Sequence, residues 1–388
     1  MRQIPERADR LVVVLSDVEM GAGGQVDDFP HSPFLAELCT SYNDPPYKSL
    51  PVDLVFNGDT FDLLKTSVDG KHPRHVTEAV ALAKLDRVLS AHPAFLEGMR
   101  SFLTGGDAPR RVHFVIGNHD ADLVFPGVQR ALSQAIGVPG VWFPGFAVDI
   151  GDLRVEHGSQ GDPMFAVDER APILDWNGQQ LLDLPWGAVA LLDTLIPLQN
   201  QLSALDRVKP RPRVFEVLPE FKALMGNLFW KYWTREYLVG LWSGDDPMRK
   251  LSWSMLKEIL YRSTSFDPDA SASDHYHRLV SDQDRYRVVV IGHLHSPGWW
   301  SWADRKVLQA GCLRDEFAVD VDGNVLGLLP KVYTEVFLAN GRAIRSHLVE
   351  VDGPPPVPGH VPANIRELKG LIEQLNAQLG PADPAAPR

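Results

Sequence analysis

An apolar run that ends abruptly in polar residues constrains the fold of this sequence more than any other feature. Residues 111–120 read RVHFVIGNHD, so a β-branched stretch gives way to Gly117, Asn118, His119 and Asp120. Continuous apolar character predicts a strand that is buried on both faces. A strand of this kind that ends in glycine and polar residues indicates a site at the carboxyl edge of a sheet. Asn offers a neutral oxygen ligand, His can transfer a proton, and Gly permits a sharp turn.

Four other apolar runs end in the same way, in carboxylates or histidines. The residues that follow these runs are Asp17 and Glu19 after 11–16, Asp59 and Asp62 after 52–57, His157 after 153–156, and His293 and His295 after 286–291. Side chains two residues apart on an extended segment point to the same side. We therefore expect Asp17 and Glu19 to converge, and likewise His293 and His295.

The strand-end residues together form a ligand set for metal ions. They supply four oxygen and three nitrogen ligands, from Asp17, Glu19, Asp59, Asn118, His157, His293 and His295. This number suffices for two octahedral-leaning ions that share one bridging carboxylate. Two cations ~3.5 to 4 Å apart can activate a bridging hydroxide and neutralise the charge that develops on a phosphoryl group.

The chain divides into four predicted parts. Residues 1–158 and 285–352 form the two parts of a core, 159–284 an inserted helical cap, and 353–388 a proline-rich linker, short helix and tail. Within the core, the pattern predicts two helical pieces over 76–103 separated at Pro93, a helix over 128–136, two strands near 141–157 joined at 151–152, and a hairpin at Asn340-Gly341.

Aromatic and basic residues suggest where a substrate binds. The insertion holds six of the ten tryptophans, which either line a slot for an apolar group or form the cap's own core. Trp299 and Trp300, directly after His295, are predicted to wall the substrate. The segment 207–213, RVKPRPR, is interpreted as a solvated basic loop or, alternatively, as a contact for phosphates or an anionic bilayer.

The composition limits which binding partners and which cellular compartment we expect. The formal net charge is -12, so the global field does not favour nucleic acid or anionic lipid, and no specific nucleic-acid binding is expected. Cys39 and Cys312 are the only cysteines, which excludes a disulfide framework and suits a reducing cytosol. The N-terminal stretch shows no secretion signal, and no apolar run reaches the ~18 to 20 residues of a membrane span. We expect a cytoplasmic protein, at most peripheral to the inner face of the membrane. The oligomeric state is not given by the sequence.

The ordered motifs resemble those of the calcineurin-like metallophosphoesterase superfamily. Its pattern is D-x-H, G-D-x-x-D, G-N-H-[DE], a later H-G, and G-H-x-H. The matching segments here are 17–19 (DVE), 58–62 (GDTFD), 117–120 (GNHD), 157–158 (HG) and 292–295 (GHLH). A helical insertion between the last two motifs makes the layout most similar to that of bacterial UDP-2,3-diacylglucosamine hydrolases. The resemblance implies an α/β (α+β) fold, a four-layer αββα sandwich of two mixed β-sheets with an inserted helical cap.

The resemblance also implies a role for each site residue. Asp17 and His295 would bind the first metal, Asp59 would bridge, and Asn118, His157 and His293 would bind the second. His119 would donate a proton or contact the phosphate, and Asp62 would orient it.

Glu19 stands where the family has His. It either binds the first metal, favouring Mn²⁺ over Zn²⁺, Fe²⁺ or Mg²⁺, or turns away and leaves its place to water.

The activity implied is hydrolysis of a phosphoester or pyrophosphate bond by a metal-bridging hydroxide, on a phosphorylated small-molecule or lipid-linked substrate. Leu63 follows Asp62 where protein Ser/Thr phosphatases have Arg-Gly, which disfavours that class. A nuclease or cyclic-nucleotide phosphodiesterase is the alternative enzyme, although SbcD-type nucleases carry their capping domain after G-H-x-H. A non-catalytic scaffold with a decayed metal site is a further alternative. Such scaffolds lose several ligands, whereas only Glu19 is altered here.

Overall fold

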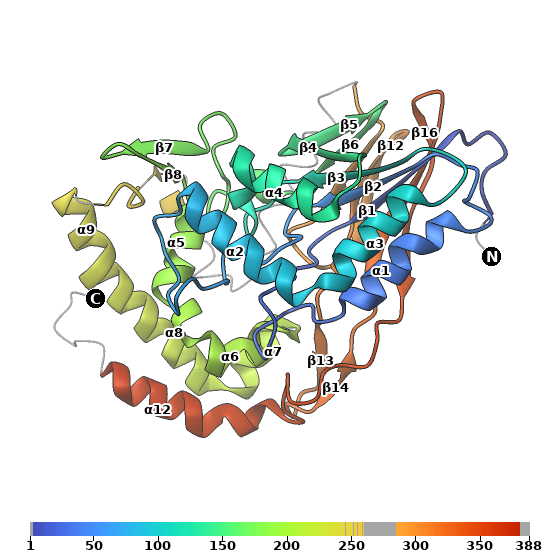
Figure 1. The fold of residues 1–388 in the computed structure, drawn as a ribbon. Coiled ribbons are helices and arrows are strands. Elements are labelled where there is room, and N and C mark those ends of the chain that lie inside the picture. Colours follow the sequence, from blue (N-terminus) through green and yellow to red (C-terminus); the bar gives the residue numbers. More distant parts are fainter. Residues whose placement is uncertain are drawn as a thin grey trace.

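Two mixed β-sheets packed face to face form the centre of the molecule in this computed structural model (Figure 1). The structure describes residues 3–244, 246–250, 252–253, 255–257, 259 and 285–380. The first sheet has the strand order β16-β15-β1-β2-β3-β4. Its strands are β1 (Arg10–Leu15), β2 (Val52–Asn57), β3 (Arg110–Val115), β4 (Val141–Gly145), β15 (Lys331–Ala339) and β16 (Arg342–Val351). Strands β1 to β4 are parallel, and β15 and β16 run antiparallel to their neighbours.

The second sheet has the order β11-β12-β10-β6-β5, with β6, β10 and β12 parallel. Its strands are β5 (Ala147–Ile150), β6 (Leu153–Glu156), β10 (Val288–Ile291), β11 (Gly298–Trp302) and β12 (Arg305–Gln309). Val12 and Val14 of β1 pack with Val155 and Val290 of this sheet, while Leu11 on the other face of β1 belongs to a different cluster. This two-sided burial explains the unbroken apolar runs in the sequence.

Helices cover the outer face of the first sheet. They are α1 (Ser32–Thr40), α2 (Glu78–Ala91), α3 (Pro93–Thr104) and α4 (Pro126–Ile136), with the short 3₁₀ turns η1 (Ser41–Asn43) and η2 (Ala121–Val124). The predicted break at Pro93 is confirmed, because proline begins α3 where its missing N–H costs nothing. The expected sandwich of two mixed sheets is likewise confirmed. On the outer face of the second sheet, the described cluster around Val289 and Ile291 contains strand and loop residues only.

One detail of the core differs from the sequence prediction. Residues 141–156 form three strands rather than two, because β4 belongs to the first sheet and β5 to the second. Gly145 ends β4 with a φ of 87°, a left-handed conformation that glycine adopts without strain. The chain thereby crosses from one sheet to the other. The hairpin at Asn340-Gly341 is confirmed, with positive φ at both residues as a tight two-residue turn requires.

The insertion is mainly helical in its described part, but it also contains strands. Its elements are η3 (Ser159–Gly161), β7 (Ile173–Trp176), β8 (Gln179–Leu182), α5 (Trp186–Asp193), η4 (Ile196–Leu198), α6 (Gln199–Asp206), β9 (Val208–Lys209), α7 (Arg211–Val217), α8 (Pro219–Lys231), the π-helix η5 (Tyr232–Tyr237) and α9 (Leu238–Ser243). Strands β7 and β8 form a hairpin, and β9 pairs with β13 (Phe317–Val319), which also pairs with β14 (Val325–Leu328). The insertion thus joins the part of the chain that follows it.

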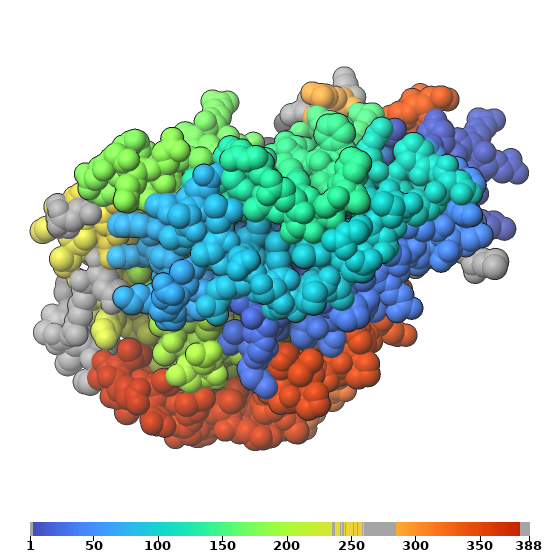
Figure 2. Space-filling view, viewed as in Figure 1, coloured from blue at the N-terminus to red at the C-terminus, as the bar shows by residue number. Residues whose placement is uncertain are grey.

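The C-terminal helix packs onto the insertion. After the turn η6 (Ile365–Leu368), helix α12 (Lys369–Leu379) places Ile372 and Leu375 against Leu224 and Leu228 of α8. Figure 2 shows this red segment along the lower edge of the molecule, next to the green insertion. The predicted tail beyond residue 380 lies outside the described residues. No helix in the described ranges is both long and apolar enough to cross a membrane.

Candidate metal centre

The predicted ligands come together because they follow strands that end at the same edge. Asp17, Asp59 and Asn118 follow the parallel strands β1, β2 and β3, while His157 and His293 follow β6 and β10 of the facing sheet. Five of the seven predicted ligands have left-handed backbones, with φ of 50° at Asp17, 53° at Glu19, 49° at Asp59, 69° at His293 and 60° at His295. Such conformations cost about 1–3 kcal/mol each and persist where the surroundings impose them, typically at functional sites.

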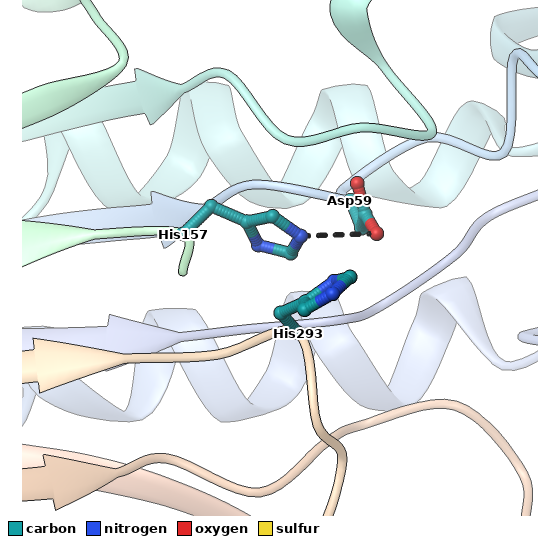
Figure 3. A group of neighbouring side chains, drawn as sticks. All are labelled: Asp59, His157 and His293. Carbon is teal, nitrogen blue, oxygen red and sulfur yellow. Dashed lines mark ion pairs between the residues drawn. The ribbon is translucent and has the colours of Figure 1, made fainter. Parts of the chain in front are cut away.

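Asp59, His157 and His293 form one compact group (Figure 3), with a ligand atom of each within 4.8 Å of the others. Nδ1 of His157 donates to the carbonyl oxygen of Asn57 at 2.9 Å. Its Nε2 then faces Oδ2 of Asp59 at 3.2 Å and Oδ1 of Asn118 at 3.1 Å. Without a metal ion, a proton on Nε2 would satisfy these two oxygens; a shared cation would replace that proton and leave the imidazole neutral. Burial alone would lower the pKa of His157, but the carboxylate of Asp59 outweighs it and raises the pKa to about 9.

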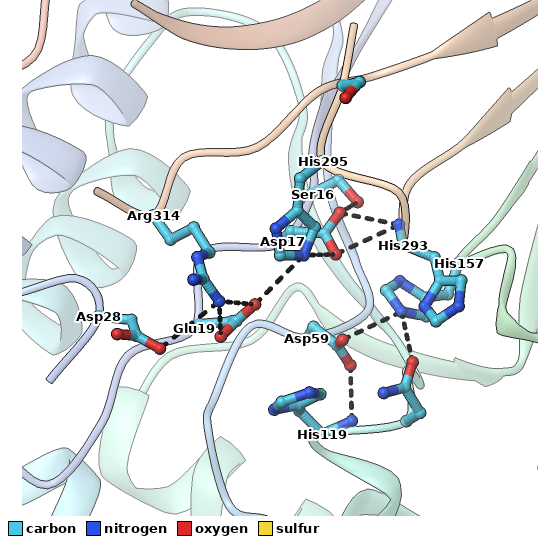
Figure 4. Close-up of polar contacts among 12 residues, drawn as sticks. Ser16, Asp17, Glu19, Asp28, Asp59, His119, His157, His293, His295 and Arg314 are labelled. Carbon is cyan, nitrogen blue, oxygen red and sulfur yellow. Dashed lines mark hydrogen bonds and ion pairs between the residues drawn. The ribbon is translucent and has the colours of Figure 1, made fainter. Parts of the chain in front are cut away.

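His295 shows the same arrangement on the other side of the centre (Figure 4). Nδ1 lies 3.0 Å from Oε1 of Glu316, and Nε2 lies 3.3 Å from both Oδ1 of Asp17 and Oε1 of Glu19. Asp17 is held in turn by Ser16, whose hydroxyl donates to Oδ2 at 2.6 Å. The donor set therefore fits two hard or borderline divalent cations, one near Asp17 and His295 and one near His157 and His293.

Glu19 is completely buried, and besides His295 it contacts two cationic side chains, those of Arg314 and Lys65. Nη1 of Arg314 lies 2.8 Å and 3.0 Å from its two carboxylate oxygens, and Nζ of Lys65 lies 3.3 Å away. Burial would raise the pKa of Glu19, but Arg314 and Lys65 reverse this effect and hold it well below its usual range. Glu19 thus faces His295 and Arg314 together.

His119 lies beside the group and has the partner that the sequence predicts. Its Nδ1 donates to Oδ1 of Asp62 at 2.9 Å, and its backbone N–H donates to Oδ1 of Asp59 at 2.7 Å. Burial would lower the pKa of His119, but Asp59 and Asp62 raise it to about 10. Nδ1 is thus engaged by Asp62, and the ring lies beside Asp59 and Glu19.

Several residues that contact the predicted ligands were missed in the sequence, including Lys65, which lies 3.3 Å from Glu19. Asp162 lies 3.0 Å from Nε2 of His293, Glu316 contacts His295, and Arg314 contacts Glu19. Arg314 and Glu316 follow the apolar run 307–313, so they share the signal that identified the other ligands. Asp162 lies in a loop of the insertion and carries no such signal.

The last residue of GNHD also has a role, since Asp120 accepts from the backbone N–H groups of Gly117 and Thr60 and joins the two turns.

A cavity of about 440 Å³ opens from the centre into the insertion. Asp59, Asn118, His119 and His293 line one end. Most of the remaining surface is apolar, with contributions from Leu191, Leu195, Leu202, Val214, Phe215 and Phe221. Charged side chains also line the cavity, among them Lys65, Asp206, Lys209, Arg211 and Arg314. The insertion places an apolar pocket directly beside the cluster of ligands.

The aromatic residues singled out in the sequence lie away from the cavity, whereas two of the basic residues, Lys209 and Arg211, line it. Trp299 and Trp300 lie on the edge strand β11 and are not among the described residues that line the cavity. The insertion's tryptophans do not line it either in the described part: Trp186 is buried in a separate cluster, and Trp242 is 89% exposed. The interpretation of 207–213 as a solvated loop is wrong for Arg207, which is fully buried and donates to Oδ1 of Asp28 at 2.7 Å.

Comparison with known proteins gives similarity to solved structures only. No protein-family model matches the chain, and no curated protein matches it either. The chain is similar to a conserved uncharacterized protein of Streptococcus pneumoniae described as a predicted phosphoesterase (11% identity, 88% of this chain and 97% of that chain covered, TM-score 0.27). It is also similar to zinc-complexed Vps29 of Entamoeba histolytica (11%, 88% and 98%, 0.23) and to the calcineurin-like phosphoesterase YfkN of Bacillus subtilis (12%, 96% and 98%, 0.31). TM-scores this low carry no conclusion about this chain.

Proposed function

We propose that this protein is a hydrolase of phosphoester or pyrophosphate bonds that uses two divalent metal ions. The observation that carries the proposal is the orientation of two histidines. His157 and His295 each place Nδ1 against an oxygen acceptor and direct Nε2 at carboxylates, as ligands oriented by outer hydrogen bonds do. The ordered motifs of the sequence support the same function.

Each of the two metals would be held by its own set of side chains. Asp17 and His295 would hold the first, Asn118, His157 and His293 the second, and Asp59 both; Glu19 would add a further oxygen to the first. When bound, two such cations activate water and neutralise charge on the phosphoryl group. The oxygen-rich set with the extra carboxylate of Glu19 favours Mn²⁺.

The protein's own residues would position the substrate and move a proton. Asn118 and His119 line the cavity beside Asp59, where they would contact phosphoryl oxygens. His119, whose Nδ1 is held by Asp62, would donate the proton on Nε2 to the leaving group.

The cavity supports a substrate with a large apolar group. An aliphatic wall gains free energy from burying an acyl or similar chain, at roughly 25 cal/mol per Å² of apolar surface removed from water. The polar end would hold the phosphate of the same molecule. A lipid-linked phosphoester or pyrophosphate fits this division better than a nucleic acid does, and the net charge of -12 agrees with it.

Hydrolysis of matched synthetic substrates tests the proposal. The substrates are p-nitrophenyl phosphodiesters whose second ester group is methyl or dodecyl, assayed with and without added Mn²⁺. We expect Mn²⁺-dependent release of nitrophenol, with a lower KM for the dodecyl ester. No turnover of either ester with Mn²⁺ supplied would contradict the enzymatic function, whereas equal KM values would contradict only the lipid-linked substrate.

A further inference from the structure

Asp162, in the first turn of the insertion, contacts a histidine of the candidate metal centre. It is 1% exposed, and its Oδ2 lies 3.0 Å from Nε2 of His293. The other oxygen, Oδ1, accepts from the backbone N–H of Met164 at 3.0 Å. One oxygen thus fixes the carboxylate to its own loop, and the other faces the imidazole.

His293 is held from several sides. Its backbone has a φ of 69°, and its N–H donates to Oδ2 of Asp17 at 3.0 Å. The ring of Phe165 packs edge-on against the imidazole, with 5.8 Å between ring centroids. With Nε2 donating to Asp162, Nδ1 is left as the nitrogen that can bind a metal. A carboxylate on the outer nitrogen fixes the tautomer and ring orientation of a histidine ligand and raises its basicity.

The loop that carries Asp162 is anchored to the helices that wall the cavity. The carbonyl of Asp162 accepts from the N–H groups of Phe165 and Ala166 at 3.0 Å and 2.8 Å. The carbonyl of Met164 accepts from the N–H of Gly187, near the start of α5, at 2.7 Å. A Cβ on Gly187 would lie 2.6 Å from the ring of Phe165, so only glycine permits this approach. Helix α5 continues to Leu191 in the cavity wall.

We propose that Asp162 is a positioning residue through which the insertion completes the metal centre. By accepting from Nε2, it sets the orientation and basicity of His293 and so strengthens the metal position formed with Asp59 and His157. The inference rests on the proposed two-metal function. The insertion then contributes to metal binding as well as enclosing the cavity. Without its first turn, His293 would lose the carboxylate that holds its ring.

The test compares Mn²⁺ affinity in three variants. Competition with a chelating indicator dye measures Mn²⁺ binding to wild type, Asp162→Ala, Asp162→Asn and Asp168→Ala. Asp168 is the matched control: its Oδ1 accepts from the N–H of Arg170 at 3.0 Å, the same local contact that Asp162 makes with Met164, and no histidine contact is described for it. The melting temperature of the chelator-treated protein is measured in parallel.

We expect one of the two Mn²⁺ affinities, that of the position formed with Asp59 and His157, to fall about 10–100-fold in Asp162→Ala. The loss should be smaller in Asp162→Asn, whose amide oxygen can still accept from Nε2, and Asp168→Ala should bind as wild type does. Equal affinity in Asp162→Ala and wild type would overturn the inference. An equal loss in Asp168→Ala, or a loss matched by a lower melting temperature of the metal-free protein, would overturn it in favour of loop stability. Absence of Mn²⁺ binding to wild type would instead overturn the proposed function, and the inference with it.

Discussion

Oε1 of Glu316 lies 3.0 Å from Nδ1 of His295, on the opposite side of the ring from Asp17. Glu316 is 6% exposed, and burial would raise its pKa, but hydrogen bonding to His295 lowers the pKa to about 2. The carboxylate is therefore ionised at neutral pH. It is the counterpart, for the first metal position, of the Asn57 carbonyl that orients His157.

Replacing Glu316 should weaken the first metal position. In Glu316→Leu the Nδ1 hydrogen of His295 loses its acceptor, so Mn²⁺ affinity should fall about 10–100-fold. Glu216, on the exposed face of α7 and paired with Arg213, provides the control Glu216→Leu. Calorimetric titration with Mn²⁺ measures both variants, and unchanged affinity in Glu316→Leu would remove Glu316 from the metal centre.

Removing Arg314 should destabilise the fold. Glu19 would then keep Lys65, His295 and His119 as cationic neighbours in a buried position but lose the paired guanidinium, and breaking a buried pair costs about 3–5 kcal/mol. Arg213 forms an exposed pair with Glu216, so Arg213→Ala should cost about 0–1 kcal/mol. Urea unfolding of the chelator-treated proteins gives both free energies. Similar values for Arg314→Ala and Arg213→Ala would show that Arg314 is not the counter-ion of Glu19.

His119 should affect turnover without affecting metal content. Its contacts are to Asp62 and, through its backbone, to Asp59, so His119→Ala should retain both ions while kcat falls about 10²–10⁴-fold. The effect should be smaller for a phosphodiester with a nitrophenolate leaving group, which needs no proton, than for an alkyl leaving group. Full turnover of the alkyl substrate by His119→Ala would contradict the role of His119 as proton donor.

Filling the cavity should discriminate between substrates. Leu195 lines its apolar wall, so Leu195→Trp should raise KM for a dodecyl phosphodiester at least tenfold and leave KM for the methyl ester within about twofold. Leu326, which is 68% exposed and does not line the cavity, gives the control Leu326→Trp. If Leu195→Trp raised both KM values equally, the apolar wall would not bind the substrate's chain.

Much of the centre followed from the sequence because parallel strands share an edge. Asp17, Asp59 and Asn118 each come after a buried strand, and their convergence needs only that these strands be neighbours. The hairpin at Asn340-Gly341 was also predicted, because its signal lies in two adjacent residues. The switch between sheets at Gly145 was not predicted, since strand periodicity does not say to which sheet a strand belongs.

Local patterns of this kind do not predict contacts between residues that are distant in sequence. Asp162 and His293 are 131 residues apart, and Glu19 and Arg314 are 295 apart, so no local spacing links either pair. Trp299 followed a site motif and was expected to wall the substrate, but it lies on the edge strand β11 with 60% of its surface exposed. The apolar part of the cavity wall comes instead from leucines, valine and phenylalanines such as Leu195 and Phe215. Such residues carry no signal that separates a pocket from a core.

Elemental analysis of metal content tests the central claim most directly. The protein is incubated with Mn²⁺, freed of unbound metal by gel filtration, and compared with Asp59→Ala and with the exposed-site control Asp168→Ala. Wild type and Asp168→Ala should each retain about two ions per chain, and Asp59→Ala, without the shared carboxylate, fewer than one. No retained metal in wild type, or equal retention in Asp59→Ala, would contradict a two-metal centre at this site.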